Sequence, residues 1–357
     1  MQKLKINHQT LTDIINIKHN VFLPIKKFLS KKDFFSVIKK KKLSSGKFFP
    51  FPIFFSVGEN DYKRILNEKK IQIIYGQNLV CILKINSFYI VDKKKIGKKI
   101  FNTSNLNHPG FRYFVETGDY NIDCEIKDFN KGILKTINFS NPSIIKKIIK
   151  KRELKTIVGF HTRNVPHRAH EWIHSFGLKN CKGLLVQPMI GQFKKNEYKS
   201  HHILNSNKKL VENIYRKKNI LFTFFNSYPR YGGPREALFH ALVRKNYGCT
   251  HFLVGRDHAG YKNFYKKYES QNFCKKNEKK IKIKILKFSE PFLCKKSKKI
   301  FNDKKLCKGE KFLISGTYIR NLLLKKKNIP SSIMRKEISV LLNEDSIIKK
   351  TNRSSPQ

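Results

Sequence analysis

From residue 155 onward, short apolar runs alternate with helical segments, and loops rich in Gly, Pro or polar residues separate them. The strand-like runs are KTIVGF, GLLVQPMI, ILFTFF, HFLVG and IKIKILKF, and the helical patterns are PHRAHEWIHSFG, LVENIYRKK and PREALFHALVRKNYG. This alternation predicts an α/β fold, in which helices cover both faces of a parallel sheet. Ligands of such sheets bind beyond the carboxyl ends of the strands. We therefore expect the loops after KTIVGF and HFLVG to meet in one pocket.

The residues before this region follow a different pattern. Up to about residue 145, turn residues separate short apolar runs such as FFPFPIFFSV (48–57), QIIYGQNLVCILKI (72–85) and SFYIVD (87–92), and YGQN is a candidate hairpin turn. A chain of 357 residues is too long for one small core. We expect a mostly β domain over residues 1–148, an α/β domain over 149–312 and a small helical region over 313–357.

The formal net charge of +51 would by itself suggest a nucleic-acid-binding protein. However, the lysines are scattered through every segment, whereas a nucleic-acid surface usually gathers its cations in one stripe. We therefore expect no specific nucleic-acid partner. Eight of the 13 arginines lie between residues 152 and 256, namely Arg152, Arg163, Arg168, Arg216, Arg230, Arg235, Arg244 and Arg256. Guanidinium groups bind phosphate or sulfate with two bonds, so an anion site is expected in this region.

Cysteine content and hydropathy indicate the cellular compartment. Seven cysteines in a long chain, an odd number without a dense framework, fit a reducing environment. No segment approaches the roughly 18 apolar residues that a membrane helix needs. A cytoplasmic protein without membrane association is expected.

The first candidate site is FHTRNVPHRAH (160–170). Asn164 or Thr162 can cap the helix that follows, and free backbone N–H groups at a helix start favour an anion. His167 and His170 are three residues apart, so both can donate to phosphate oxygens from one face. Arg163 adds a two-bond contact. Together these residue types favour a polyphosphate site over a plain capped helix.

The same stretch also contains HEWIH (170–174), which fits the H-E-x-x-H zinc motif. In that alternative His170 and His174 bind zinc and Glu171 is the general base. Such a short pattern arises by chance in a chain with 12 histidines. It also lacks an identified third ligand, so it is the weaker interpretation.

Two further blocks carry polar residues at the starts of helices. In YPRYGGPREALFHALVRKNYGCTHFLVGRDHAG (228–260), Gly232 and Gly233 permit a close backbone approach to a ligand. GRDHAG offers cationic or donor side chains and backbone N–H groups in a turn. In ISGTYIRNLL (314–323), Ser315 and Thr317 can cap a helix.

Taken together, these blocks resemble the ATP sulfurylase (sulfate adenylyltransferase) family, nucleotidyltransferases with an HxxH phosphate motif. FHTRNVPHRAH resembles the family's F-Q-T-R-N-P-x-H-R-A-H, the second block resembles its nucleotide and sulfate loops, and ISGTYIRNLL resembles its I-S-G-T-x-x-R segment. Weaker likenesses extend the match over most of the chain: FLPIKKF, FPFPI, NHPGFRYF, GDYNID and MRKEISVLL. The resemblance implies a PUA-like β domain followed by a Rossmann-like catalytic domain, in the single-function form.

The implied reaction joins sulfate to the α-phosphorus of MgATP, giving adenosine 5′-phosphosulfate and pyrophosphate. The resemblance implies that sulfate contacts His161, Arg163 and the Ala259 backbone. Its implied catalytic set is Thr162, Arg163, Asn164, His167, His170 and Arg256. The implied ATP-binding set is His161, Thr162, Arg163, Asn164, His167, His170, Gly255, Arg256, Asp257, His258 and Phe292, with Phe292 against adenine. Mg²⁺ is expected to arrive with ATP, and a homo-oligomer is expected.

Three departures from the family pattern bear on the site. His161 replaces the family's Gln, and an imidazole can still donate one bond. Asn-Val-Pro replaces Asn-Pro, with the proline at Pro166. Many relatives have a zinc knuckle with four ligands, but this chain keeps only Cys294 and Cys307 and has Ser297 in place of a third. No structural zinc is expected.

One other class of function stays open at this point. A basic, non-enzymatic binding module would bind DNA or RNA tightly, with strong salt dependence, and would not turn over ATP when sulfate is present.

Overall fold

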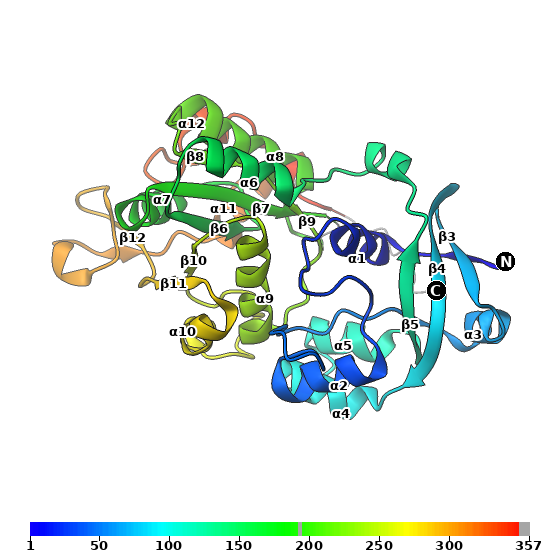
Figure 1. The fold of residues 1–357 in the computed structure, drawn as a ribbon. Helices are drawn as coiled ribbons and strands as arrows, with labels where there is room; N and C mark the ends of the chain where they lie inside the picture. Colours follow the sequence, from blue (N-terminus) through cyan, green and yellow to red (C-terminus); the bar gives the residue numbers. More distant parts are fainter. Residues whose placement is uncertain (192–194, 350–357) are drawn as a thin grey trace.

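The computed structural model describes residues 1–191 and 195–349. Two sheets and a small ribbon organise the chain, and Figure 1 shows the sheets toward opposite ends of the molecule with α1 and α9 between them. No helix among the described residues is long and apolar enough to cross a membrane.

The first sheet has five strands in the order β1 (Lys3–Lys5), β3 (Lys70–Tyr75), β4 (Asn78–Ile90), β5 (Tyr120–Lys127) and β2 (Ser56–Val57). β1 pairs parallel with β3, and the other pairs are antiparallel. The predicted YGQN hairpin joins β3 to β4, and Gly76 adopts φ +59°, which a side chain would disfavour.

Helices are more abundant in this half than the apolar runs indicated. They are α1 (His8–Lys18), α2 (Lys31–Lys40), α3 (Glu59–Ile65), α4 (Lys93–Phe101) and α5 (Pro109–Glu116), with a 3-10 turn η1 (Lys131–Lys135). Of FFPFPIFFSV, only the last two residues join a strand. Pro50 and Pro52 remove two N–H donors that a ladder would need, although the alternate residues Phe49, Phe51 and Ile53 are still buried.

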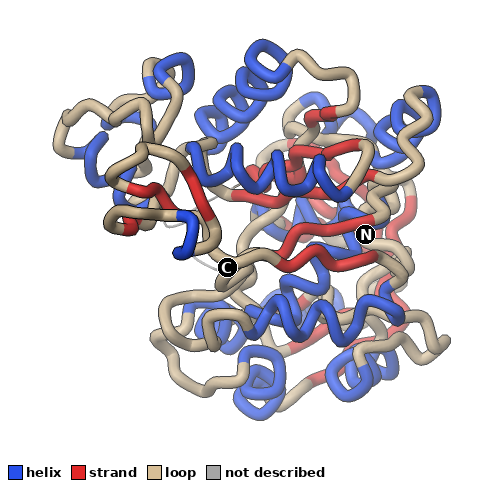
Figure 2. The backbone as a smooth tube through the Cα atoms, turned by 90° about the vertical axis from the view of Figure 1, so that its left-hand side faces the viewer, coloured by secondary structure: helices blue, strands red, loops and turns tan. Residues whose placement is uncertain are grey.

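The second sheet is parallel, as the alternation predicted. Its order is β11 (Lys284–Lys287), β10 (His251–Val254), β6 (Ile157–Thr162), β7 (Gly183–Ile190) and β8 (Ile220–Phe222), and β9 (Phe225–Asn226) also pairs with β7. The helices of this half are α6 (Pro142–Lys151), α7 (Arg168–Asn180), α8 (Ser200–Lys208) followed by the π-helical η2 (Lys209–Tyr215), α9 (Gly233–Asn246) and α10 (Glu269–Ile281). Helices lie on both sides of the strands (Figure 2).

Strand alternation decides which side chains meet which helices. Val158 and Phe160 pack with Ile173 of α7 on one face, whereas Ile157 joins the core that contains α9 on the other. His161 is four residues after Ile157 and therefore points toward α9.

One hydrophobic core is shared between the two halves. Its buried residues run from Leu4 in β1 to Ile285 in β11, and α9 contributes residues such as Phe239 from its middle. α9 is buried on nearly all sides, which explains why its sequence lacks a clear amphipathic pattern.

The remaining elements cover one end of the second sheet. An antiparallel ribbon consists of β12 (Phe292–Cys294), β13 (Ile300–Phe301) and β14 (Lys311–Phe312), with the short η3 (Lys304–Leu306) between the last two. α11 (Gly316–Leu324), α12 (Lys336–Ser339) and η4 (Glu344–Ser346) follow, and they pack in a second core with α8 residues.

Candidate active site

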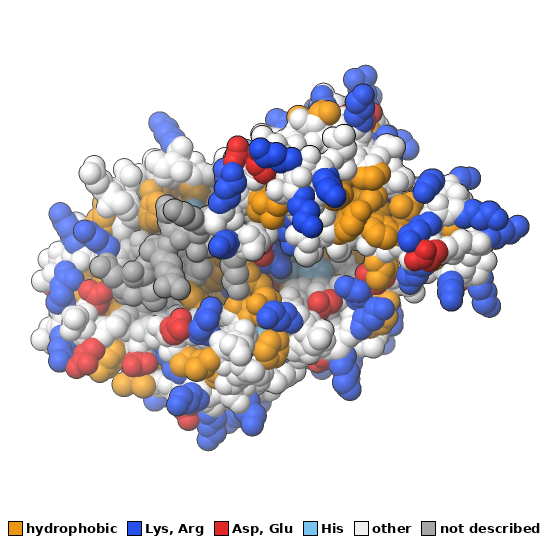
Figure 3. Space-filling view, turned by 180° about the vertical axis from the view of Figure 1, so that it is seen from behind, with side chains coloured by type: hydrophobic (Ala, Val, Ile, Leu, Met, Phe, Trp, Pro, Cys, Tyr) orange, Lys and Arg blue, Asp and Glu red, His pale blue; other side chains and the backbone are white. Residues whose placement is uncertain are grey.

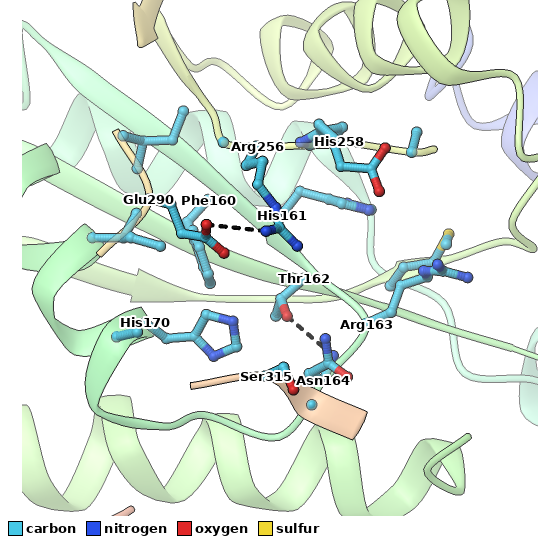
Figure 4. Close-up of a pocket in the computed structure, with 18 of the residues that line it drawn as sticks. Phe160, His161, Thr162, Arg163, Asn164, His170, Arg256, His258, Glu290 and Ser315 are labelled. Atoms are coloured by element: carbon cyan, nitrogen blue, oxygen red, sulfur yellow. Dashed lines mark hydrogen bonds and ion pairs between the residues drawn. The ribbon is translucent and has the colours of Figure 1, made fainter. Parts of the chain in front are cut away.

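A pocket of about 330 Å³ lies beyond the carboxyl ends of β6 and β10. The loops after these two strands and the segment before α11 line it together, as the strand-end rule predicted (Figure 4). All but one of the predicted site residues line this pocket: His161, Thr162, Arg163, Asn164, His167, His170, Gly255, Arg256, Asp257, His258 and Ala259. The structure does not bring Phe292 to the wall, because its ring is 1% exposed and lies under the Lys311 ammonium.

The turn after β6 is held by hydrogen bonds rather than by the expected helix cap. The Asn164 backbone N–H donates to the Thr162 hydroxyl (3.0 Å), a bond drawn in Figure 4. His167, not Asn164 or Thr162, occupies the N-cap of α7, and no side chain caps the helix there. The first N–H groups of α7 therefore lack the side-chain acceptor that we predicted.

Asn164 is also tied to the third motif. Arg320 of α11 donates to its side-chain oxygen (3.3 Å), and Ser315 caps α11 by accepting from the Tyr318 N–H (3.1 Å), as expected. A Cβ on Gly316 would lie 2.6 Å from the Asn164 side-chain oxygen. ISGTYIR thus supports Asn164 as well as starting a helix.

His167 and His170 form a stacked pair at the start of α7. Their ring centroids lie 3.7 Å apart with an interplanar angle of 20°. Burial lowers the pKa of both, that of His170 to about 4, so both rings are neutral near neutral pH. Each ring then carries one N–H that can donate to a phosphate oxygen.

A second group of histidines lines the side of the pocket next to α9. His161 stacks on His240 (4.2 Å between centroids), and the His240 Nδ1 is 3.1 Å from the His258 Nε2. Burial and the neighbouring cations lower the pKa of all three rings. Glu236 approaches the other ring nitrogen of His240 (3.4 Å).

By spacing alone this group could hold a metal ion, since one ligand atom of each histidine lies within 4.8 Å of the others. The Nδ1 of His161 already accepts from Arg244 (2.5 Å), and His240 faces His258 through Nδ1 (3.1 Å) and the Glu236 carboxylate through Nε2 (3.4 Å). Arg163 and Arg244 also add positive charge nearby. The group therefore suits an anion better than a cation.

Arg163 and Arg256 approach the pocket from different strands. The Arg163 guanidinium lies 3.6 Å from Glu197 and over the Tyr231 ring (5.4 Å). Arg256 pairs with Glu290 at 3.0 Å, as drawn in Figure 4, and its side chain is 41% exposed. Both guanidinium groups serve one pocket and remain accessible to a ligand that can replace a carboxylate.

The backbone of GRDHAG adopts an unusual conformation. Asp257 and Ala259 have φ of +51° and +60°, in the left-handed region that costs a side-chain-bearing residue roughly 1 kcal/mol or more. Within this turn the Asp257 N–H donates to the Lys267 carbonyl (2.9 Å) and the Gly260 N–H to the Asp257 carbonyl (3.2 Å), while Ala259 lines the pocket.

Gly232 and Gly233 do make close approaches, but to protein rather than to a ligand. A Cβ on Gly232 would overlap the Phe51 ring, and one on Gly233 would lie 2.6 Å from Tyr265. The two glycines thus let α9 pack tightly against aromatic residues, and neither of them lines the pocket.

Several lining residues did not stand out in the sequence. They include Tyr231, Glu236, His240, Phe288, Glu290 and Ile314. His240 and Glu236 are four residues apart on α9, so their spacing was a usable signal. The others follow ordinary strand or loop patterns and gain a role only from tertiary packing.

The alternative zinc motif is not assembled. Glu171 is held by Arg335 (2.7 Å) and Arg168 (3.4 Å), and His174 is buried against the Tyr215 hydroxyl (2.9 Å). Among the described residues, the group that could hold a metal does not contain His170 or His174. HEWIH is therefore helix-packing sequence in this fold.

The clustered arginines divide into ligand-facing and structural ones. Arg230 forms a buried ion pair with Asp13 of α1 (2.6 Å), and Arg235 donates to the Ile38 carbonyl (2.6 Å). These contacts join the two halves of the chain. The clustering located the region correctly but overestimated how many arginines reach the pocket.

Comparisons with known proteins agree with this geometry. The ATP-sulfurylase family model matches residues 138–345, and a PUA-like domain model matches residues 1–131. The chain is 32% identical to the sulfate adenylyltransferase of Ignicoccus hospitalis, covering 98% of this chain and 92% of that protein. It is 33% identical to the sulfate adenylyltransferase of Thermococcus onnurineus, covering 94% and 88%.

A solved structure shares the fold at low sequence identity. The hexameric APS kinase from Thiobacillus denitrificans aligns with a TM-score of 0.72 and 14% identity, over 96% of this chain. This chain spans 62% of that protein's length. The first sheet with its helices is a PUA-like mixed β half-barrel, as the resemblance implied. The chain therefore belongs to the ATP-sulfurylase family and has a PUA-like domain in its N-terminal half.

Proposed function

We propose that the protein is a sulfate adenylyltransferase, which joins sulfate to the α-phosphorus of ATP and releases pyrophosphate. One observation carries this proposal: three segments far apart in the sequence bring arginine and imidazole side chains and the GRDHAG turn into a single pocket. The chain resembles proteins named sulfate adenylyltransferase over nearly its full length, and this likeness supports the same activity.

For sulfate we propose a subsite at the α9 side of the pocket. His161, Arg163 and the Ala259 backbone N–H would surround the oxyanion, and His258 lies close by with a ring centroid 5.3 Å from that of His161. Neutral N–H donors and a guanidinium can hold a dianion in a buried place without a counter-cation.

For ATP we propose the side of the pocket that begins at α7. Thr162, Arg163 and Asn164 would face the transferring phosphoryl group, and the stacked His167 and His170 would donate to the phosphates and to leaving pyrophosphate. Gly255, Arg256, Asp257 and His258 would contact the nucleotide. Since Phe292 lies behind the wall, we propose Phe288, which lines the pocket, as the apolar contact for adenine.

The chemistry proposed for this site is direct in-line attack of sulfate on the α-phosphorus. Sulfate is a dianion without a proton to remove, so no general base or covalent intermediate is required. The nearby carboxylates fit this view, because Glu236 is engaged with His240 and Glu290 with Arg256. Positioning and charge neutralisation then lower the barrier, and Mg²⁺ arrives on the ATP phosphates.

A single assay tests the proposal. Purified protein with MgATP should release pyrophosphate when sulfate or molybdate is added, and should release none when chloride replaces them. Pyrophosphate release that does not depend on either oxyanion, or no release at all, would contradict the assignment.

Three expectations from the sequence stay predictions alongside this function. They are the domain limits 1–148, 149–312 and 313–357, a homo-oligomer in solution, and the lack of structural zinc at Cys294 and Cys307. Elemental analysis of purified protein tests the last, and sedimentation equilibrium tests the oligomer.

A further inference from the structure

Arg244 of α9 is a buried cation outside the pocket lining. Its side chain is fully buried, and its Nη2 donates to the His161 Nδ1 (2.5 Å) and to the Gln187 carbonyl (3.1 Å). Its Nε and Nη1 are buried without a hydrogen-bond partner among the described residues. No ion pair between described residues includes Arg244, so its charge is not matched by a carboxylate there.

The fold makes room for this side chain. A Cβ on Gly159 of β6 would lie 2.6 Å from the Arg244 Cγ, so only glycine fits opposite it. The rings of Phe225 and Phe252 face the guanidinium at 5.2 and 5.8 Å. Burial lowers the pKa of Arg244 to about 9, which still leaves it protonated at neutral pH. Arg244 is therefore a permanent donor to His161.

His161 itself is neutral, and this makes the position of its proton decisive. Burial lowers its pKa, and His240, Arg244, His258 and Arg163 around it lower that pKa further. A neutral imidazole has one N–H and one lone pair, so it either donates to a sulfate oxygen or repels it. Nδ1 accepts from Arg244 and therefore carries no proton. The proton must then be on Nε2, which has no hydrogen-bond partner in the described part of the chain.

We propose that Arg244 is a positioning residue that holds His161 in the Nε2–H tautomer, so that the ring donates a hydrogen bond to sulfate. The inference rests on the proposed function for the identity of the anion. The tautomer itself can be measured without substrate or turnover. In this way a histidine does the work of the amide N–H at a position where the family motif has Gln.

The first experiment determines the tautomer directly. Protein with nitrogen-15-labelled histidine is compared by NMR with H161Q, which identifies the His161 signals by their loss. We expect a protonated Nε2 and an unprotonated Nδ1 in the wild type and in R244K, which keeps a donor. R244M removes this donor but keeps a side chain of similar length, and it should give a mixture of tautomers. A proton on Nδ1 in the wild type overturns the proposal without any variant.

The second experiment separates positioning from general structural support. R244M should raise the KM for sulfate roughly 10- to 100-fold, the scale of a hydrogen bond to a charged group, while the KM for ATP changes less. When R244M is added to H161A, the KM for sulfate should stay within about twofold of the value for H161A alone, because Arg244 acts through that ring. An equal loss in both backgrounds shows a purely structural role and overturns the proposal.

An inactive wild type with the expected tautomer would instead count against the proposed function alone. The NMR experiment tests the tautomer and the pyrophosphate assay tests the proposed function, so each proposal can be contradicted without the other.

Discussion

Arg163 holds a position in which a guanidinium can exchange one partner for another. It lies 3.6 Å from Glu197 and stacks over Tyr231, so an incoming oxyanion can take the place of the carboxylate without moving the backbone. In the proposed function its planar fork would contact the oxyanions with paired bonds, a geometry that a lysine ammonium does not offer.

We expect R163A to cost at least ~3 kcal/mol of transition-state stabilisation, or roughly 100-fold in kcat/KM. R163K should recover part of the loss, because it restores the charge but not the two-bond geometry. Steady-state kinetics of sulfate-dependent pyrophosphate release measure both. Values for R163A near those of the wild type would remove this residue from the proposed mechanism.

The buried histidines also set how stability depends on pH. Burial, and to a lesser degree His170, lower the pKa of His174 to about 3, whereas an unfolded histidine titrates near 6.5. Below pH 6.5 the unfolded chain therefore binds a proton that the folded chain does not. The stability that His174 contributes is complete above 6.5 and is lost as the pH falls toward 3.

For H174Q we expect the free energy of unfolding to fall less steeply between pH 6.5 and pH 5 than in the wild type. The difference should approach about 1.4 kcal/mol per pH unit, the value for one proton. Urea titrations at several pH values give this slope. Equal slopes for H174Q and the wild type would show that His174 titrates normally.

At the scale of elements, α11 acts as a support for the turn after β6. Arg320 donates to the Asn164 side chain, and Gly316 at the start of α11 lies directly against the same oxygen. A small change in α11 should therefore reach the pocket through Asn164.

G316A places a methyl group 2.6 Å from the Asn164 oxygen and should displace that side chain. We expect a loss of about tenfold or more in kcat/KM for ATP, because small misplacements of positioning groups are costly. The circular dichroism spectrum and Tm should change little. The matched control is G58A, since a Cβ there meets no atom within 4 Å. If G316A and G58A have the same activity, α11 does not position Asn164.

The strands and loops of the site could be predicted from the sequence, and so could α9 as a helix, but not which of its residues belong to the site. GLLVQPMI coincides with β7, and the rule that ligands bind at strand ends brought HTRN and GRDHAG together correctly. α9 contributes His240 and Arg244 through its buried interior, where no periodic pattern separates core from function. In the first half, helices such as α4 were missed because KKKIGKKIF shows few apolar residues.

At the scale of the whole molecule, the lysines are scattered along the whole sequence. On the face in Figure 3, Lys and Arg side chains are dispersed among neutral and acidic ones. The lack of a specific nucleic-acid partner stays a prediction from the sequence, and a gathered basic groove on this face would have counted against it.

With 76 Lys and Arg residues against 25 Asp and Glu, repulsion between like charges should destabilise the folded state at low ionic strength. We expect Tm to rise when NaCl is increased from low to moderate concentration, because the Debye length shortens to about 10 Å or less. Differential scanning calorimetry measures this, and KCl at equal ionic strength should act alike. A Tm that stays constant or falls would mean that the charges are already compensated.

The two halves of the chain share the hydrophobic core that runs from β1 to β11, and the buried Asp13–Arg230 ion pair also connects them. A hinge motion of one half against the other would separate these packed side chains and expose the core to water. We therefore expect substrates to enter and leave the pocket without a large movement of the two halves. Two ion pairs at the pocket, Arg163–Glu197 and Arg256–Glu290, are the contacts that ligands would have to exchange on entry.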